Sequence, residues 1–370
     1  MRFELNPEGW IWWPEREDLS LEFMRLLAAA QDGGSTVSEC WLTAARVDFT
    51  DDESWHREWT RAAEVSRARA VAAAAGGNQV TARSNWLRAI NYYQAAAYPL
   101  DLAPDRQQAA VAAMRECAAN YLQHREPRGE VVSIPWLEEF PLQGYFLPAR
   151  PTGEPAPVVI SIGEPGHRKE ESLFKLACHA FERGISLLAV DLLGDGTGAT
   201  FEEMARRNKP ERAIEPIMDY LAARDDVDER RIAIISDGCS SSFVARGITF
   251  DPRVAAAVCD GGIWDLHVRT FVKRRIGPFG MEAGHSPETG RMLRNTSCPL
   301  LITAGERGWL RAERVAELTD QLKAGNPERD VTLKIFERAE TGAAQGHVDN
   351  PTLANEFIFD WIASRIGVET

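Results

Sequence analysis

The amino-acid sequence predicts an α/β protein in which an N-terminal helical domain precedes a doubly wound, mostly parallel sheet. The first part of the chain is rich in alanine, has apolar side chains at helical spacing and shows no strand pattern. In the second part, short apolar runs typical of buried strands alternate with helical segments. Such βαβ alternation gives a doubly wound sheet, which holds ligands at the carboxyl ends of its strands. We therefore expect two domains, 1–128 and 129–370.

The helical domain is expected to contain four to six helices. Apolar and small side chains recur at helical spacing over 41–49, 59–66 and 86–97. A further amphipathic helix is predicted over 105–121, and the pair Gly76-Gly77 separates two of the helices. We interpret the tryptophan and tyrosine side chains of this domain as core residues rather than as a ligand box.

The sheet is expected to begin with two antiparallel strands, 131–134 and 142–147, which a proline-rich linker over 148–157 follows. Helices are predicted between the later strands, for example over 170–183 and 212–223. The remaining strands are predicted to be parallel and buried, and they cover 158–162, 186–190, 232–235, 254–258, 300–303 and 331–335.

Composition excludes several classes of partner. The formal net charge of −13 disfavours nucleic acid, because such binders need a basic face that releases counterions. No run of 18 or more apolar residues is present, so no membrane span is expected. The N-terminus has no apolar segment typical of a secretory signal.

The cysteine pattern predicts neither a metal nor disulfides. The six cysteines are scattered, and no CxxC or Cys/His spacing suggests zinc. Scattered thiols in an acidic chain without a signal indicate a reducing, cytoplasmic location. The glycines at 194, 196 and 198 are a weak match to a nucleotide loop, so we expect no dinucleotide and no other cofactor.

Several segments, taken in order, carry a more specific signal. A strand is followed by the loop 163–168 and then by Lys-Glu-Glu at 169–171. A Val-Asp pair at 190–191 precedes Gly-Asp-Gly at 194–196, and Gly-Gly-Ile-Trp-Asp-Leu lies at 261–266. Val-Asp-Asn-Pro at 348–351 precedes Phe-Asp-Trp at 359–361. As a set, these motifs resemble the FrsA-like and 2,6-dihydroxypseudooxynicotine hydrolase-like branch of the α/β-hydrolases.

The resemblance implies an α/β-hydrolase fold with a helical cap domain and a small organic or natural-product substrate. In this branch such a substrate is often a β-diketone or aryl ketone with a cleavable C–C bond. The resemblance also implies a homodimer formed through the helical domain. The loop 163–168 corresponds to the oxyanion loop, to which backbone N–H groups near Gly163 and at Cys239 would contribute.

The three positions of the family's Ser–His–Asp triad depart from the pattern. The nucleophile of this fold lies in G-x-S-x-G, a sharp strand-to-helix turn, and the aligned residue here is Gly238. The position of the acid is taken by Gly308 and the position of the histidine by Gln345, two residues before His347. Because this mechanism needs nucleophile, base and acid together, three departures indicate that it was abandoned.

Two residues beside Gly238 are candidates for new chemistry. Cys239 is a candidate nucleophile, with His347 as base and Glu306 or Asp349 as acid, and the alternative interpretation is a small buried thiol. Asp237 is a candidate carboxylate base, or alternatively the cap of the helix expected to start at Ser240.

The loop after the first parallel strand offers a second group of candidates. His167 and Glu164 form a candidate acid/base pair at the rim of the site, although a histidine bonded within its own loop fits as well. Ser240 is expected to cap its helix rather than act as a nucleophile. The positions expected to line the substrate site are Gly163, Gly238, Ser240, Gln345 and Glu306.

Three functions are compatible with these residues, each with a small molecule as the partner. The first is an enzyme that performs acid/base chemistry such as enolisation, cyclisation, lyase or isomerase steps in the hydrolase cleft. The second is a Cys239-dependent hydrolase of an ester or a C–C bond. The third is a ligand-binding module on the same scaffold, because fold does not fix function.

Overall fold

The computed structural model describes residues 12–98, 102–137, 140–163, 168–191, 210–238, 240–262, 298–308, 310–325 and 327–369. The chain forms two compact units. The first, a helical unit, consists of Met1–Glu130 with the segments Glu170–Cys178 and Val348–Thr352. The second, an α/β unit, consists of Val131–Lys169, His179–His347 and Leu353–Thr370. The helical unit therefore includes two short segments from parts of the sequence that follow the N-terminal helices.

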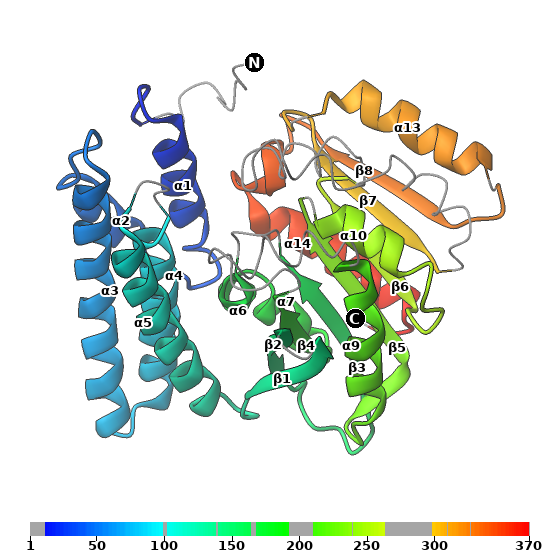
Figure 1. Ribbon diagram of the computed structural model, residues 1–370, viewed down its shortest axis with the longest axis horizontal. Helices are drawn as coiled ribbons and strands as arrows, with labels where there is room; N and C mark the ends of the chain where they lie inside the picture. The colour runs from blue at the N-terminus through cyan, green and yellow to red at the C-terminus, as the bar shows by residue number, and fades with distance from the viewer. Residues whose placement is uncertain are drawn as a thin grey trace. The chain divides into compact units, whose positions relative to one another are not determined.

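Long antiparallel helices form the helical unit (Figure 1). The turn at Gly76-Gly77 confirms the predicted break, and Gly77 has φ +75°, a conformation that favours glycine. None of the described helices is long and apolar enough to cross a membrane. The described helices of this unit are α1 (Glu17–Ala28), α2 (Val37–Ala44), α3 (Asp52–Ala75), α4 (Gln79–Ala96), α5 (Pro104–Gln123) and α6 (Ser172–Lys175).

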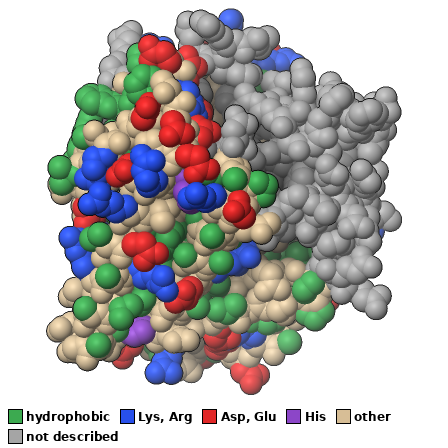
Figure 2. Space-filling view, turned by 60° about the vertical axis from the view of Figure 1, so that its left-hand side comes forward, with side chains coloured by type: hydrophobic (Ala, Val, Ile, Leu, Met, Phe, Trp, Pro, Cys, Tyr) green, Lys and Arg blue, Asp and Glu red, His purple; other side chains and the backbone are tan. Residues whose placement is uncertain are grey.

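Aromatic side chains form the core of this unit, as predicted. Trp55, Trp59 and Tyr92 are fully buried, and their rings follow one another at centroid distances of 5.5 and 5.7 Å. The indole Nε1 of Trp55 donates a hydrogen bond of 2.7 Å to the carbonyl of Ala95, which satisfies its polar atom inside the core. Outside the core, basic and acidic side chains lie interspersed on the face that Figure 2 shows.

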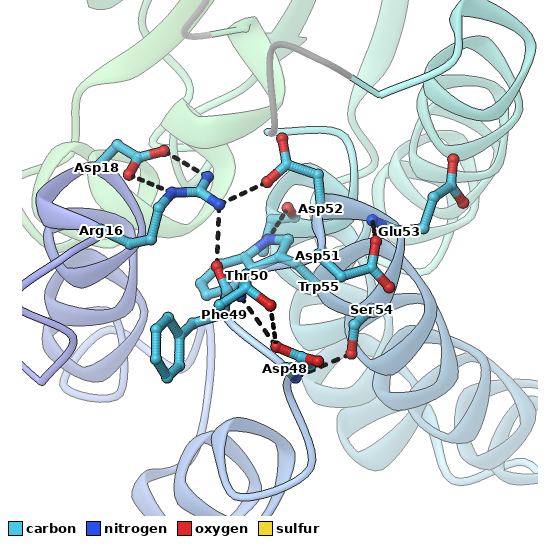
Figure 3. A network of polar contacts seen from close by, with 11 residues as sticks. Arg16, Asp18, Asp48, Phe49, Thr50, Asp51, Asp52, Glu53, Ser54 and Trp55 are labelled. Atoms are coloured by element: carbon cyan, nitrogen blue, oxygen red, sulfur yellow. Dashed lines mark hydrogen bonds and ion pairs between the residues drawn. The ribbon is translucent and has the colours of Figure 1, made fainter.

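Polar contacts fix the start of α3 (Figure 3). Asp51 precedes the helix, and its carboxylate accepts a hydrogen bond of 3.0 Å from the backbone N–H of Glu53. Arg16 binds Asp52 at 2.8 Å and thereby joins the first turn of α3 to the residue before α1. Acceptors and carboxylates at a helix start complement its unpaired N–H groups and its dipole.

An eight-stranded sheet forms the α/β unit, in the order β1-β2-β4-β3-β5-β6-β7-β8. Strand β2 pairs antiparallel with β4, and the neighbours from β4 through β8 pair parallel. This confirms the predicted α/β-hydrolase fold. The strands are β1 (Glu130–Leu137), β2 (Phe140–Leu147), β3 (Ala156–Ile162), β4 (Ser186–Val190), β5 (Val227–Asp237), β6 (Ala256–Asp260), β7 (Leu300–Gly305) and β8 (Val331–Phe336).

One face of the sheet packs with helices in a continuous apolar cluster. Alternate strand residues, among them Ile160, Ile234 and Ile302, join side chains of α9 and α10 in this cluster, because successive strand side chains point to opposite faces. The described helical segments along this part of the chain are η1 (Lys169–Glu171), α7 (Ala177–Glu182), η2 (Pro210–Ala213), α9 (Ile214–Ala222), α10 (Ser240–Gly247), α13 (Ala312–Gly325), η5 (Gln345–His347) and α14 (Pro351–Arg365).

Two predicted boundaries are corrected. The helix predicted over 170–183 is interrupted, since Leu176 has φ −121° and separates α6 from α7. The strand predicted over 254–258 lies two residues later, at β6, because its register pairs Ala233 with Ala256 and Asp237 with Asp260. The apolar run alone did not show that the strand continues to a carboxylate. This shift makes Asp260 the last residue of a central strand.

A buried ion pair holds the start of η1 to the end of β4. The backbone N–H of Lys169 donates to one carboxylate oxygen of Asp191 at 2.8 Å, and its Nζ donates to the other at 2.6 Å. The two side chains are 3% and 7% exposed. Each charge therefore depends on the other, because an unpaired buried charge is strongly disfavoured.

We expect Lys169→Met to lower the free energy of unfolding by about 3–5 kcal/mol, because it removes the positive charge that lies beside the buried Asp191 carboxylate. The matched control is Lys334→Met, which removes a partly exposed pair with Glu340 and should cost less than about 1 kcal/mol. Urea unfolding followed by circular dichroism measures both. Equal losses in the two variants would contradict the role given to burial.

Candidate functional site

A tight turn lies at the carboxyl edge of the sheet where this fold places its nucleophile. Strand β5 ends at Asp237 and α10 begins at Ser240, so Gly238 opens the turn. Gly238 has φ +52°, and its N–H donates a hydrogen bond of 3.0 Å to the carbonyl of Asp260. A positive φ is strained for residues with a Cβ and free of strain for glycine. Gly238 itself thus has a backbone conformation suited to a sharp strand-to-helix turn such as a nucleophile elbow, and it carries no side chain.

The amide of Gln345 lies beside this turn. A Cβ built on Gly261 would lie 3.3 Å from Gln345 Nε2 and 3.7 Å from the Cα of Gly238. A Cβ built on Gly308 would lie 3.1 Å from Gln345 Oε1. The residues at the three positions of the family's triad therefore lie close together; they are Gly238, Gln345 and Gly308. The space beside the amide depends on glycines at 261 and 308.

Asp260 connects the turn with the loop that carries Gln345. Its backbone carbonyl accepts the hydrogen bond from Gly238, and its carboxylate Oδ1 accepts one of 2.7 Å from the hydroxyl of Thr303. The same Oδ1 lies 2.8 Å from His347 Nε2. Neither Asp260 nor Thr303 was identified from the sequence. The available signal was a carboxylate between a buried apolar run and the pair Gly261-Gly262, at the end of a parallel strand.

His347 is buried and faces oxygen atoms on both sides of its ring. It is 1% exposed, its Nδ1 lies 2.6 Å from the carbonyl oxygen of Gly342, and its Nε2 faces Asp260. Phe336 covers the ring edge-on at a centroid distance of 4.6 Å. The structure thus places His347 inside the protein, and Cys239, for which the sequence suggested it as the base, lies outside the described residues.

Two serines that follow the turn are committed to backbone carbonyls. Ser240 Oγ donates to the carbonyl of Gly163 at 2.7 Å, and Ser241 Oγ donates to the carbonyl of Asp260 at 2.9 Å. Both are fully buried in the first turn of α10. The bond from Ser240 replaces the capping role that was expected for it and connects α10 to the end of β3.

Asp237 is the more accessible carboxylate at this edge. It is half-buried, whereas Asp260, its register partner on the neighbouring parallel strand, is 4% exposed. Asp260 is in turn the register partner of Thr303 on β7. A row of polar side chains therefore crosses the ends of three adjacent strands, and Asp237 is the member of this row that is most exposed.

The remaining candidates divide into two groups. Glu306 is exposed, and its carboxylate accepts a hydrogen bond of 2.8 Å from the backbone N–H of Arg338. This contact occupies the carboxylate outside the cluster around Asp260. Cys239, Glu164 and His167 lie outside the described residues.

Comparisons with known proteins agree with this architecture. The solved structure of 2,6-dihydroxy-pseudo-oxynicotine hydrolase matches with a TM-score of 0.73 and 19% identity, over 93% of this chain and 97% of that chain. At this identity the likeness establishes the fold alone. It confirms the fold that the motifs indicated.

Relatives in sequence come from fungi. "Hydrolyase poxO" of Penicillium oxalicum is 28% identical over 278 residues, which cover 72% of this chain and 65% of that protein. "20-hydroxy-prefusarin hydrolase FUS2" of Gibberella moniliformis is 30% identical over 254 residues, which cover 65% of this chain and 60% of that protein. The chain thus spans somewhat less than two thirds of the length of these relatives.

A family model supplies the assignment. The model described as "Esterase FrsA-like" matches residues 19–276, which extend from the third residue of α1 to beyond the end of β6. Because the match covers well over half of the chain, the protein belongs to the FrsA-like esterase family.

Proposed function

We propose that this protein is an α/β-hydrolase-fold enzyme that acts on a small organic or natural-product substrate by acid/base chemistry without a serine nucleophile. One observation carries the proposal: Gly238 occupies the turn at the end of β5 and has no side chain that could attack a substrate. The hydroxyls of Ser240 and Ser241 are buried and bonded to carbonyls, so they are poorly placed to replace a serine there.

Asp237 is the proposed base. It is half-buried at the carboxyl end of β5, where doubly wound sheets hold their ligands. A carboxylate in this place can remove a proton from the carbon next to a substrate carbonyl, which leaves an enolate. Proton transfer of this kind needs a positioned acid or base and no covalent intermediate.

The Gln345 amide is the proposed ligand of the substrate oxygen. Its Nε2 is an uncharged donor beside Gly238 and Gly261, and such a donor stabilises the charge that develops on an enolate oxygen. Asp260 and His347 act as positioning residues in this proposal. They hold the 345–347 turn against the ends of β6 and β7 through the contact between Nε2 and Oδ1.

The relatives support the proposed substrate class. One relative's name gives 20-hydroxy-prefusarin as its substrate, and the others with hydrolase names come from fungi as well. Membership of the same family supports a substrate of similar kind, while the specific molecule differs with the residues that line each pocket.

We expect Asp237→Asn to slow proton exchange by about 10²–10⁴-fold, the usual contribution of a positioned acid or base. The readout is deuterium incorporation next to the carbonyl of aryl ketone and β-diketone probes in D₂O, followed by NMR. The control is Asp225→Asn, an exposed carboxylate on the loop before β5, which should leave the rate unchanged.

A serine-directed fluorophosphonate probe tests the same proposal from the other side. Stable labelling of any serine, with loss of activity, would overturn it. Binding of a probe ketone with neither exchange nor cleavage would instead indicate the ligand-binding alternative.

A double-mutant cycle tests the positioning pair. Asp260→Asn and His347→Gln should each cost about 3 kcal/mol or more of unfolding free energy, because each disrupts the buried contact between the two side chains. The double variant should be more stable than the sum of the losses predicts, by about 0.5–3 kcal/mol. Urea unfolding gives these values. Strict additivity would show that the two residues do not act as a pair.

Cysteine alkylation tests the competing Cys239-dependent hydrolase. Burial raises the pKa of the Cys40 and Cys298 thiols to about 11 and that of Cys117 to about 12, and it also raises the pKa of Cys259. Iodoacetamide at pH 7 should therefore spare these four thiols, because the thiolate is the reactive form. We expect Cys239→Ala to retain activity; loss of activity on Cys239 alkylation and in this variant would favour the cysteine mechanism.

A further inference from the structure

An open cavity of about 640 Å³ lies within the helical unit, where α4 begins and α5 ends. Three arginines line it: Arg83 from the second turn of α4, and Arg125 and Arg128 from the segment after α5. Glu126 is its single acidic lining residue. This cavity belongs to the helical unit alone and shares no residue with the cluster around Asp260.

The lining carries an excess of two positive charges in a chain whose formal net charge is −13. The Arg83 guanidinium donates to the carbonyl of His124 at 3.2 Å, and that of Arg125 donates to the carbonyl of Pro127 at 3.3 Å. These contacts orient the two side chains without neutralising them. Burial, with a contribution from nearby Arg83, lowers the pKa of the Arg125 guanidinium.

The start of α4 adds to the positive potential of the cavity. Gln79, the first residue of this 18-residue helix, is also a lining residue. Asn78 precedes the helix and makes no side-chain capping hydrogen bond. The first N–H groups of a helix and its dipole favour a negative charge at this end.

We propose that this cavity binds a small anion with two or more negative charges, a phosphate-bearing or polycarboxylate compound, through Arg83, Arg125 and Arg128. The guanidinium group matches both chemistries, because its parallel N–H donors engage two oxygens of a phosphate or carboxylate at once. Such a ligand would offset the excess of positive charge that the lining residues carry.

Isothermal titration calorimetry of the full chain tests the proposal, with pyrophosphate and citrate as probes and NaCl matched for ionic strength. We expect saturable binding at one site per chain, and the tighter probe identifies the phosphate or the carboxylate class. Arg83→Gln and Arg128→Gln should each weaken binding at least tenfold. The control Arg61→Gln, an exposed arginine on α3 outside the cavity, should bind as the wild type does.

Arg83→Lys separates the effect of charge from that of geometry, since it keeps the positive charge and removes the planar pair of N–H donors. An affinity between those of the wild type and Arg83→Gln supports recognition by the guanidinium. Arg128 is exposed, so its variant should keep the fold, which thermal unfolding verifies. Absence of saturable heat in the wild type overturns the proposal. Equal affinity in wild type, Arg83→Gln and Arg128→Gln overturns it as well.

Discussion

The contacts of one residue, Asp260, hold the carboxyl edge of the sheet together. Its backbone carbonyl fixes the turn at Gly238, and its carboxylate meets Thr303 and His347. A buried carboxylate is tolerated only with such partners, so the strands and the 345–347 turn must keep their relative positions. The geometry around the Gln345 amide depends on this requirement.

The same contacts support the proposed acid/base chemistry, because they hold this edge of the sheet in a fixed shape. In the hydrolase mechanism, the residues at this edge react. In this protein the buried His347–Asp260 pair connects β6 with the 345–347 turn, and the half-buried Asp237 and the Gln345 amide lie near the turn at Gly238. Catalysis by proton transfer needs one carboxylate that accepts a proton and one donor that binds the substrate oxygen, provided that both are held rigidly. The helical unit, with its cationic cavity, offers a separate place for a charged ligand.

A buried parallel strand can be predicted from the sequence because it is an uninterrupted apolar run, as at 186–190, where the predicted and observed limits agree. The prediction was less accurate at β6, where the strand continues through Cys259 to Asp260. A prediction from the hydrophobic pattern ends the strand at the first polar residue, whereas the hydrogen bonds between strands can continue through such a residue. That difference also explains why Asp260 was missed as a member of the site.

By itself the sequence determined the fold class, the division into helical and sheet-forming parts, and the meeting of Gly238, Gln345 and Gly308, because motif order and strand order fix which loops share an edge. Only the tertiary structure decided the roles of the polar groups. It buried His347 against Asp260, committed Ser240 to Gly163 and left Asp237 partly accessible. The physical reason is that burial and hydrogen-bond partners arise from residues distant in the chain, and spacing along the sequence does not reveal them.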